Sequence, residues 1–205
     1  MRVGNGVEIY GGCTGFTVSN CWVYEIYDSG LTFQFGSEVP ENSVVMENVH
    51  FTNNLLEKCC YSIEFFLAGA DDLYPEGVSR YMKDIYFTDN ISADVGYGFG
   101  AAQRPDWGND SHLRVPTHWN PREGEFIVEN NLFLRSKYWI LDVGATHAED
   151  LPEMRNNVFV QTDKLGWGRF EENTPGQYVR RAFAYEFISE PKYEGNQFYV
   201  IPAAN

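Results

Sequence analysis

Basic residues are scarce in this sequence, which has 15 lysines and arginines against 29 aspartates and glutamates and a formal net charge of −14. That charge repels the phosphate backbone of nucleic acid and an anionic membrane surface, so a polyanion would need a local basic patch. No run of 18 apolar residues occurs, and the first ten residues lack the basic start and apolar stretch of a signal peptide. We therefore expect no nucleic-acid partner, no membrane insertion and no secretion signal in this chain.

Cysteine is also scarce, with only Cys13, Cys21, Cys59 and Cys60 among 205 residues. Four cysteines are too few for a fold that depends on disulfides, and their spacing is not that of a zinc site. We expect buried free thiols, because unpaired cysteine is among the most buried residue types. One disulfide or a bound metal remains as an alternative.

Large apolar side chains are plentiful, with 43% hydrophobic and 16% aromatic residues, while only 21% of residues are charged. This composition excludes a disordered chain and a coiled coil, and the length suits one globular domain. The composition therefore bounds the class of protein without naming a function.

A short motif recurs along the chain: an apolar strand, one or two polar residues, an asparagine and a second apolar strand. The copies are Phe16–Val23, Phe51–Leu56, Phe87–Ile91, Ile127–Phe133, Arg155–Val160 and Tyr193–Phe198. Nine to eleven residues after the asparagine comes the centre of another apolar segment. These segments are Gly30–Phe35, Ser62–Phe66, Gly98–Ala102 and Trp139–Val143. Each unit therefore predicts three short strands, with asparagine in turns that need a left-handed backbone.

From Gly6 to Val200, these turns and strand triplets resemble the pectate-lyase-like right-handed parallel β-helix proteins. The resemblance implies an all-β solenoid, for which a β-sandwich with coincidental asparagine turns is the alternative. We expect coils over residues 1–173, with long loops at 67–84 and 103–125, and a closing segment or cap over 174–205 that includes a strand at Arg181–Phe187. Because Gly6–Tyr10 already has the pattern of a strand of a first coil, we expect the chain to be the C-terminal part of a longer β-helix.

Equivalent residues of stacked parallel strands lie in rows about 4.8 Å apart, so aligned coils predict which side chains share a surface. We expect Leu31, Ile63, Phe99 and Leu141 to face inward. The next positions then form an outward row of Thr32, Glu64, Gly100 and Asp142, which Glu8 and Gly168 extend. Glu64 and Asp142 would stand two strands, or about 9.6 Å, apart. That spacing is close to the separation of roughly 6.5–9.5 Å between the carboxyls of an inverting glycosidase. Both are candidate catalytic residues.

The two long loops supply candidate binding residues, because binding groups concentrate on loops held by a rigid scaffold. Trp107, Trp119 and Tyr74 would stack on sugar rings. Arg104 and Arg114 would clamp a uronate carboxylate, and His112 or His118 would exchange protons near neutral pH. His112 is the histidine we place among the candidate catalytic residues.

Each of these residues also has an ordinary structural role to weigh. Outward acids are usually solvated, a loop tryptophan can simply pin its own loop, and a loop histidine often only donates surface hydrogen bonds. Asp71 with Asp72, or Asp106 with Asp110, lacks the six to eight oxygen ligands that calcium requires. We therefore predict no cofactor and keep calcium as the alternative.

The family resemblance also limits the choice of reaction. Polygalacturonase-like enzymes carry Asn-Thr-Asp, Asp-Asp, Gly-His-Gly and Arg-Ile-Lys motifs, of which only Asp71-Asp72 occurs here, in a loop. The Arg104-Pro105 pair does not fit the arginine-proline segment of pectate lyases. We expect a carbohydrate-active protein, a glycoside hydrolase or a polysaccharide lyase, with a polysaccharide or oligosaccharide as its partner. The alternative is a non-catalytic glycan-binding, adhesin or tailspike-like solenoid. An extracellular or cell-envelope location is implied by the resemblance alone.

Overall fold

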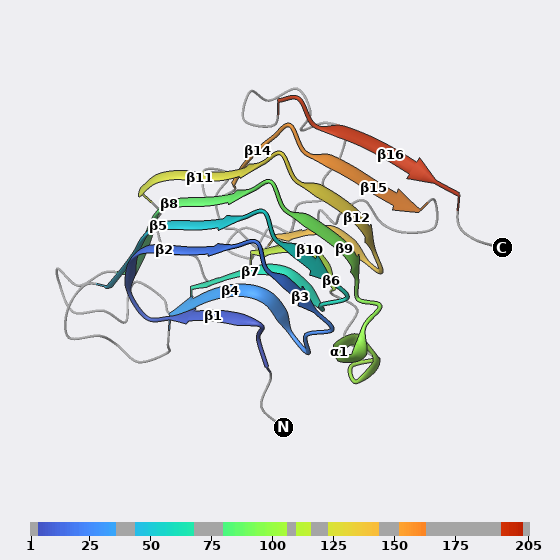
Figure 1. Cartoon of the computed structure of the whole chain (residues 1–205), viewed down its shortest axis with the longest axis horizontal. Coiled ribbons are helices and arrows are strands. Elements are labelled where there is room, and N and C mark those ends of the chain that lie inside the picture. The colour runs from blue at the N-terminus through green and yellow to red at the C-terminus, as the bar shows by residue number, and fades with distance from the viewer. Residues whose placement is uncertain are drawn as a thin grey trace, which may run out of the picture.

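The computed structural model describes residues 4–35, 44–67, 80–105, 110–115, 123–143, 152–162 and 194–202. In this part of the chain, the strands form three all-parallel sheets, and almost no helix occurs (Figure 1). Sheet A contains β1 (Val7–Tyr10), β4 (Ser29–Phe35), β7 (Tyr61–Leu67), β10 (Ser111–Val115) and β13 (Trp139–Val143). Sheet B contains β2 (Cys13–Ser19), β5 (Val44–Thr52), β8 (Arg80–Thr88), β11 (Glu123–Glu129) and β14 (Glu153–Arg155). Sheet C contains β3 (Trp22–Tyr24), β6 (Leu55–Glu57), β9 (Ile91–Val95), β12 (Leu132–Ser136), β15 (Val158–Thr162) and β16 (Gln197–Ile201).

The chain visits the three sheets in turn, so strands β1, β2 and β3 lie in sheets A, B and C, and β4 returns to sheet A beside β1. Each later pass adds one strand to each sheet, up to β15. The prediction of an all-β fold with stacked parallel strands is therefore confirmed. The first predicted strand, Gly6–Tyr10, corresponds to β1.

The repeated asparagine motif forms the turn between sheets B and C. The first residue of each turn has a left-handed backbone, with φ of 56° at Asn53 and 58° at Asp89, which asparagine and aspartate tolerate best after glycine. In every turn after the first, where Cys21 stands, the next residue is an asparagine whose side chain hydrogen-bonds to the next one along the stack, and all of these asparagines except the half-buried Asn196 are buried. This asparagine ladder comprises Asn54, Asn90, Asn131, Asn157 and Asn196.

The interior between the sheets is filled with stacked aromatic rings. In sheet C, Phe159 lies between its register partners Phe133 and Phe198, with its ring centroid 5.0 Å from each of theirs. Phe65 contacts Phe33 and Phe126 edge to face, at 4.8 and 4.4 Å. Where the same aromatic residue recurs at register positions of neighbouring strands, the rings stack at the strand spacing, so this stacking follows from the repeat.

The apolar segment Gly98–Ala102 does not form the predicted strand. Phe99–Ala102 is the short helix α1, and Phe99 is 54% exposed rather than inward-facing. The glycines here serve close packing, because a Cβ on Gly98 would lie 2.1 Å from the carbonyl oxygen of Lys58. The sheet A strand of this pass is β10, which lies inside the stretch predicted as a loop at 103–125, and β8 likewise begins inside the predicted loop at 67–84.

The four cysteines are free thiols; Cys59 and Cys60 are buried, Cys13 is half-buried and Cys21 is exposed. The free-thiol prediction is confirmed, and burial holds for two of the four. In the described part of the chain, no helix is long and apolar enough to cross a membrane.

Candidate functional site

A row of polar side chains crosses the outer face of sheet A. Strand register aligns Thr32 of β4 with Glu64 of β7, Arg114 of β10 and Asp142 of β13, and Glu8 of β1 extends the row. The positions on either side of Glu64, Ile63 and Phe65, belong to the core, so this row faces outward. Glu64 and Asp142 thus lie two strands apart, as aligned from the sequence. The residue between them is Arg114, and the placement of Gly100 there is wrong.

Although it faces outward, the row is largely shielded from solvent. Thr32 is fully buried, Glu64 is 5% exposed and Asp142 is 7% exposed. Charged groups at that depth are retained only when they are paired or hydrogen-bonded. The contacts of these three side chains therefore define the chemistry of the site.

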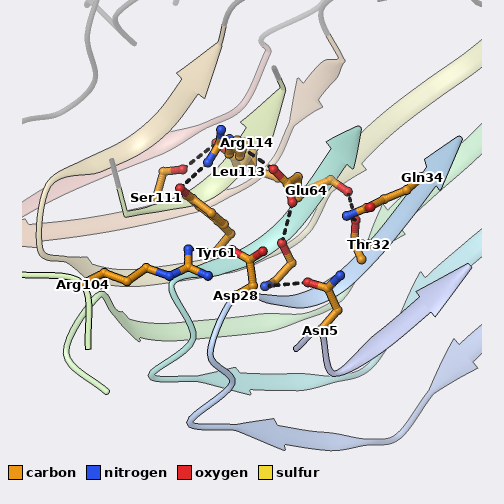
Figure 2. Close-up of polar contacts among 11 residues, drawn as sticks. Asn5, Asp28, Thr32, Gln34, Tyr61, Glu64, Arg104, Ser111, Leu113 and Arg114 are labelled. Carbon is orange, nitrogen blue, oxygen red and sulfur yellow. Dashed lines mark hydrogen bonds and ion pairs between the residues drawn. The ribbon is translucent and has the colours of Figure 1, made fainter. Parts of the chain in front are cut away.

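Arg114 is the centre of the site, as Figure 2 shows. Its Nε lies 3.2 Å from Glu64 Oε1, its Nη1 donates to the hydroxyl of Tyr61, and its guanidinium stands 4.5 Å above the Tyr61 ring centroid. Burial lowers the pKa of Arg114, but the charges of Tyr61, Glu64 and Asp142 outweigh this and raise it above its ordinary value. Arg114 is therefore a permanent cation between two carboxylates.

Glu64 has a second partner besides Arg114. The hydroxyl of Ser29 donates to Glu64 Oε2 at 2.9 Å, and the backbone carbonyl of Glu64 accepts a hydrogen bond from Thr32 at 2.9 Å. Burial raises the pKa of the Glu64 carboxyl, while Arg114 and Ser29 act in the opposite direction. Burial prevails, so Glu64 holds a proton more readily than a surface glutamate does.

A second arginine pair lies beside the strand starts of sheet A. Arg104 Nη1 is 3.0 Å from Asp28 Oδ1, and its guanidinium lies 4.2 Å from the Tyr27 ring centroid. The backbone carbonyl of Asp28 accepts hydrogen bonds from the N–H groups of Cys60 and Tyr61. The two predicted arginines are thus each held against an acid and a tyrosine, and Figure 2 shows Arg104 near Asp28 and Arg114 near Glu64.

His112 lies on the same strand as Arg114 but is turned toward the interior. It is fully buried, its Nδ1 hydrogen-bonds to the hydroxyl of Ser92 on β9, and its ring lies 5.4 Å from Phe133. Burial lowers the pKa of His112 to about 3. The ring is therefore neutral at neutral pH and points away from the row of Glu64 and Asp142, and we leave it out of the proposed chemistry.

Asp110 and Cys60 form a further buried pair near Arg104. Burial raises the pKa of Cys60 to about 12 and also raises that of Asp110. A thiol with that pKa stays protonated and is a poor nucleophile at neutral pH. Within the described ranges, no three histidine, cysteine or acidic side chains lie so as to hold a metal ion.

The remaining candidates, Trp107, Trp119, Tyr74 and His118, lie outside the described residues, as do Asp71, Asp72, Asp106, Gly168 and the strand expected at Arg181–Phe187. Sequence reasoning missed Tyr61, Ser29 and Asp28. The position of Ser29 and Tyr61 in the repeat could have indicated them, because they are in register at the starts of β4 and β7, as is Ser111 at the start of β10.

Comparison with known proteins gives no match, either to a family model, to a curated protein or to a solved structure. The geometry of the site therefore carries the functional argument.

Proposed function

We propose that the chain is a right-handed parallel β-helix solenoid that cleaves glycosidic bonds of a polysaccharide outside the cell or in the cell envelope. The passage of the chain through three parallel sheets in turn supports the solenoid. One observation carries the proposed activity: Glu64 and Asp142 share one outward row, two strands apart, with Arg114 between them.

The proposed reaction is hydrolysis with two carboxyl groups. Two strand spacings separate the two backbones by about 9.6 Å, which is close to the roughly 6.5–9.5 Å between the carboxyls of an inverting enzyme. Glu64 is the general acid, because burial favours its protonated form. Asp142 is the general base that activates water.

Arg114 links this chemistry to a class of substrate. In the free protein, the guanidinium pairs with Glu64 and thereby opposes protonation of that carboxyl. A uronate carboxylate would compete for Arg114, because arginine binds carboxylates in bidentate geometry. Released from the pair, Glu64 takes up its proton more easily. We therefore favour a uronate-containing polysaccharide, with Arg104 as a second carboxylate-binding group.

Glu64→Gln and Asp142→Asn test the hydrolase, with Glu8→Gln as the matched control because Glu8 is exposed in the same row. Purified protein is incubated with neutral and uronate polysaccharides, and both reducing ends and absorbance near 235 nm are followed. Each catalytic variant should lose at least about 100-fold in rate with binding retained, while the control keeps wild-type turnover. Unchanged turnover in both catalytic variants removes these carboxyls from the mechanism.

The same assay distinguishes the lyase alternative from the hydrolase. An eliminase creates an unsaturated sugar, so new absorbance would accompany each reducing end. In that case Arg114 and Arg104 neutralise the uronate. Hydrolysis gives reducing ends without the absorbance.

A non-catalytic glycan-binding or structural solenoid is the second candidate. It is favoured by the pairing of Glu64, whose two carboxylate oxygens already contact Ser29 and Arg114. Buried ion pairs of this kind often have only a structural role. Retained glycan binding with no turnover by the wild-type chain across the panel would support this candidate and contradict the hydrolase.

A further inference from the structure

The outer face of sheet C is almost entirely apolar. Two outward rows run across its six strands, on either side of the inward row that contains Phe133 and Phe159. The first row is Trp22, Leu55, Ile91, Leu132, Val158 and Gln197. The second row is Tyr24, Glu57, Ala93, Leu134, Val160 and Tyr199. Among these described positions, only Glu57 is charged.

Large side chains of this face are open to solvent. Trp22 is 65% exposed, Tyr24 is 52% exposed, Ile91 is 44% exposed and Tyr199 is 51% exposed. Trp22 and Tyr24 also stack on each other, with ring centroids 5.0 Å apart. Single exposed apolar residues are normal, but a contiguous apolar face across a whole sheet marks an interaction surface.

One edge of this face carries a row of charges, which we call the charged corner: Glu25, Lys58, Asp94 and Arg135. The first two follow β3 and β6 directly, while Asp94 and Arg135 are the matching positions near the ends of β9 and β12, and all four share a left-handed backbone with φ of 53–55°. Arg135 binds Asp94 in a bidentate pair at 2.7 and 2.8 Å. The signs alternate along the stack as negative, positive, negative and positive.

If a second copy presents this row in the reverse order, each charge faces a charge of the opposite sign. A two-fold axis that runs along the strand direction, between β6 and β9, reverses the stacking order of a second copy laid face to face on sheet C. Glu25 then stands opposite the partner's Arg135, and Lys58 stands opposite the partner's Asp94. All four contacts across the axis join opposite charges.

The same axis places apolar groups against apolar groups, except for Glu57, which accepts a hydrogen bond from Trp22 and lies opposite the partner's Ala93. Trp22 lies opposite the partner's Leu132, Leu55 opposite the partner's Ile91 and Tyr24 opposite the partner's Leu134. An apolar centre with a charged rim is the anatomy of specific protein interfaces. We propose that the occupant of the outer face of sheet C is a second copy of this chain, packed antiparallel through that face and the charged corner.

Sedimentation equilibrium of the full chain, over a range of protein concentrations at low salt, tests the face. The wild type should dimerise, and Ile91→Glu should weaken the dimer by at least about tenfold because it buries a charge at the centre. Tyr10→Glu is the matched control, since Tyr10 is 67% exposed on β1 of sheet A. It should dimerise as the wild type does.

Charge reversal tests the antiparallel arrangement. In Glu25→Lys homodimers, the introduced lysine would face the partner's Arg135, and in Arg135→Glu homodimers the introduced glutamate would face the partner's Glu25. Each variant alone should therefore dimerise about tenfold more weakly. An equimolar mixture of the two should regain affinity, because the mixed dimer again joins opposite charges where each homodimer opposes like ones.

Three results overturn the proposal. A wild-type chain that stays monomeric at all concentrations contradicts the dimer. If Ile91→Glu leaves the association unchanged, the contact lies on another surface. A mixture of the two charge variants that associates no better than either alone contradicts the antiparallel pairing. Circular dichroism of each variant, expected to match that of the wild type, separates these results from misfolding.

Discussion

Replacing His112 should change how the stability of the fold depends on pH. The ring is fully buried against Phe133 and hydrogen-bonds to Ser92. Its pKa in the folded chain is about 3, against an ordinary value of 6.5 for the unfolded chain. Protonation therefore favours unfolding, so the contribution of His112 is fully present above pH 6.5 and is lost as the pH falls toward 3.

The magnitude follows from the two pKa values. At pH 4 almost every unfolded chain has a protonated His112 while the folded ring stays neutral. This difference lowers the free energy of unfolding by about 3 kcal/mol at pH 4 relative to pH 7. His112→Gln removes the titration and can keep a hydrogen bond to Ser92.

Urea unfolding at pH 7, 6, 5 and 4, followed by tryptophan fluorescence, measures the effect. The advantage of the wild type over His112→Gln should shrink by about 3 kcal/mol across this range, since the titrations of the many carboxyls cancel in the difference. Ser92→Ala is the control: it weakens the fold by about 1 kcal/mol and keeps the acid sensitivity of the wild type. A pH-independent difference between wild type and His112→Gln would refute the reasoning.

The other predictions concern the turns. Asn90→Ala should lower the free energy of unfolding by at least about 3 kcal/mol, because the Asn54 N–H and the Phe51 carbonyl lose their partners. In the neighbouring turn of the stack, Asn53, with φ of 56° and an exposed side chain, should accept glycine within about 0.5 kcal/mol but lose about 1–2 kcal/mol as valine. Gly96→Ala should cost about 1–3 kcal/mol, since φ is 81° and the new Cβ would lie 2.7 Å from that of Asp110. Urea unfolding at pH 7 checks all of these, and equal losses at Asn53→Gly and Asn90→Ala would contradict the division of roles.

Local signals were enough to predict the stacked strands. A left-handed turn selects asparagine, aspartate or glycine, which marks every copy of the motif, and a ladder asparagine follows in every copy except the first, where Cys21 stands. The row of Glu64 and Asp142 was predictable from the sequence pattern, because each acid directly follows an apolar residue, Ile63 or Leu141, of an apolar segment.

The fourth pass through sheet A was not predictable in this way. Gly98–Ala102 is apolar and follows Asn90 at the usual distance, so it imitates a strand, whereas it forms α1 and the strand comes later, at Ser111–Val115. That shift placed Gly100 where Arg114 stands. The contacts of Arg114 with Tyr61 and of Arg104 with Asp28 join residues 53 and 76 positions apart, and no local pattern encodes such pairings.

In the asparagine ladder, residues that are neighbours in space are separated by unequal lengths of sequence. Its successive members lie 36, 41, 26 and 39 residues apart in the chain, yet each side chain hydrogen-bonds directly to the next. Chain added between two passes therefore leaves the stack in register, because closing a longer loop costs little extra entropy. New loops, and with them new chemistry, can be inserted into this architecture without redesigning its core.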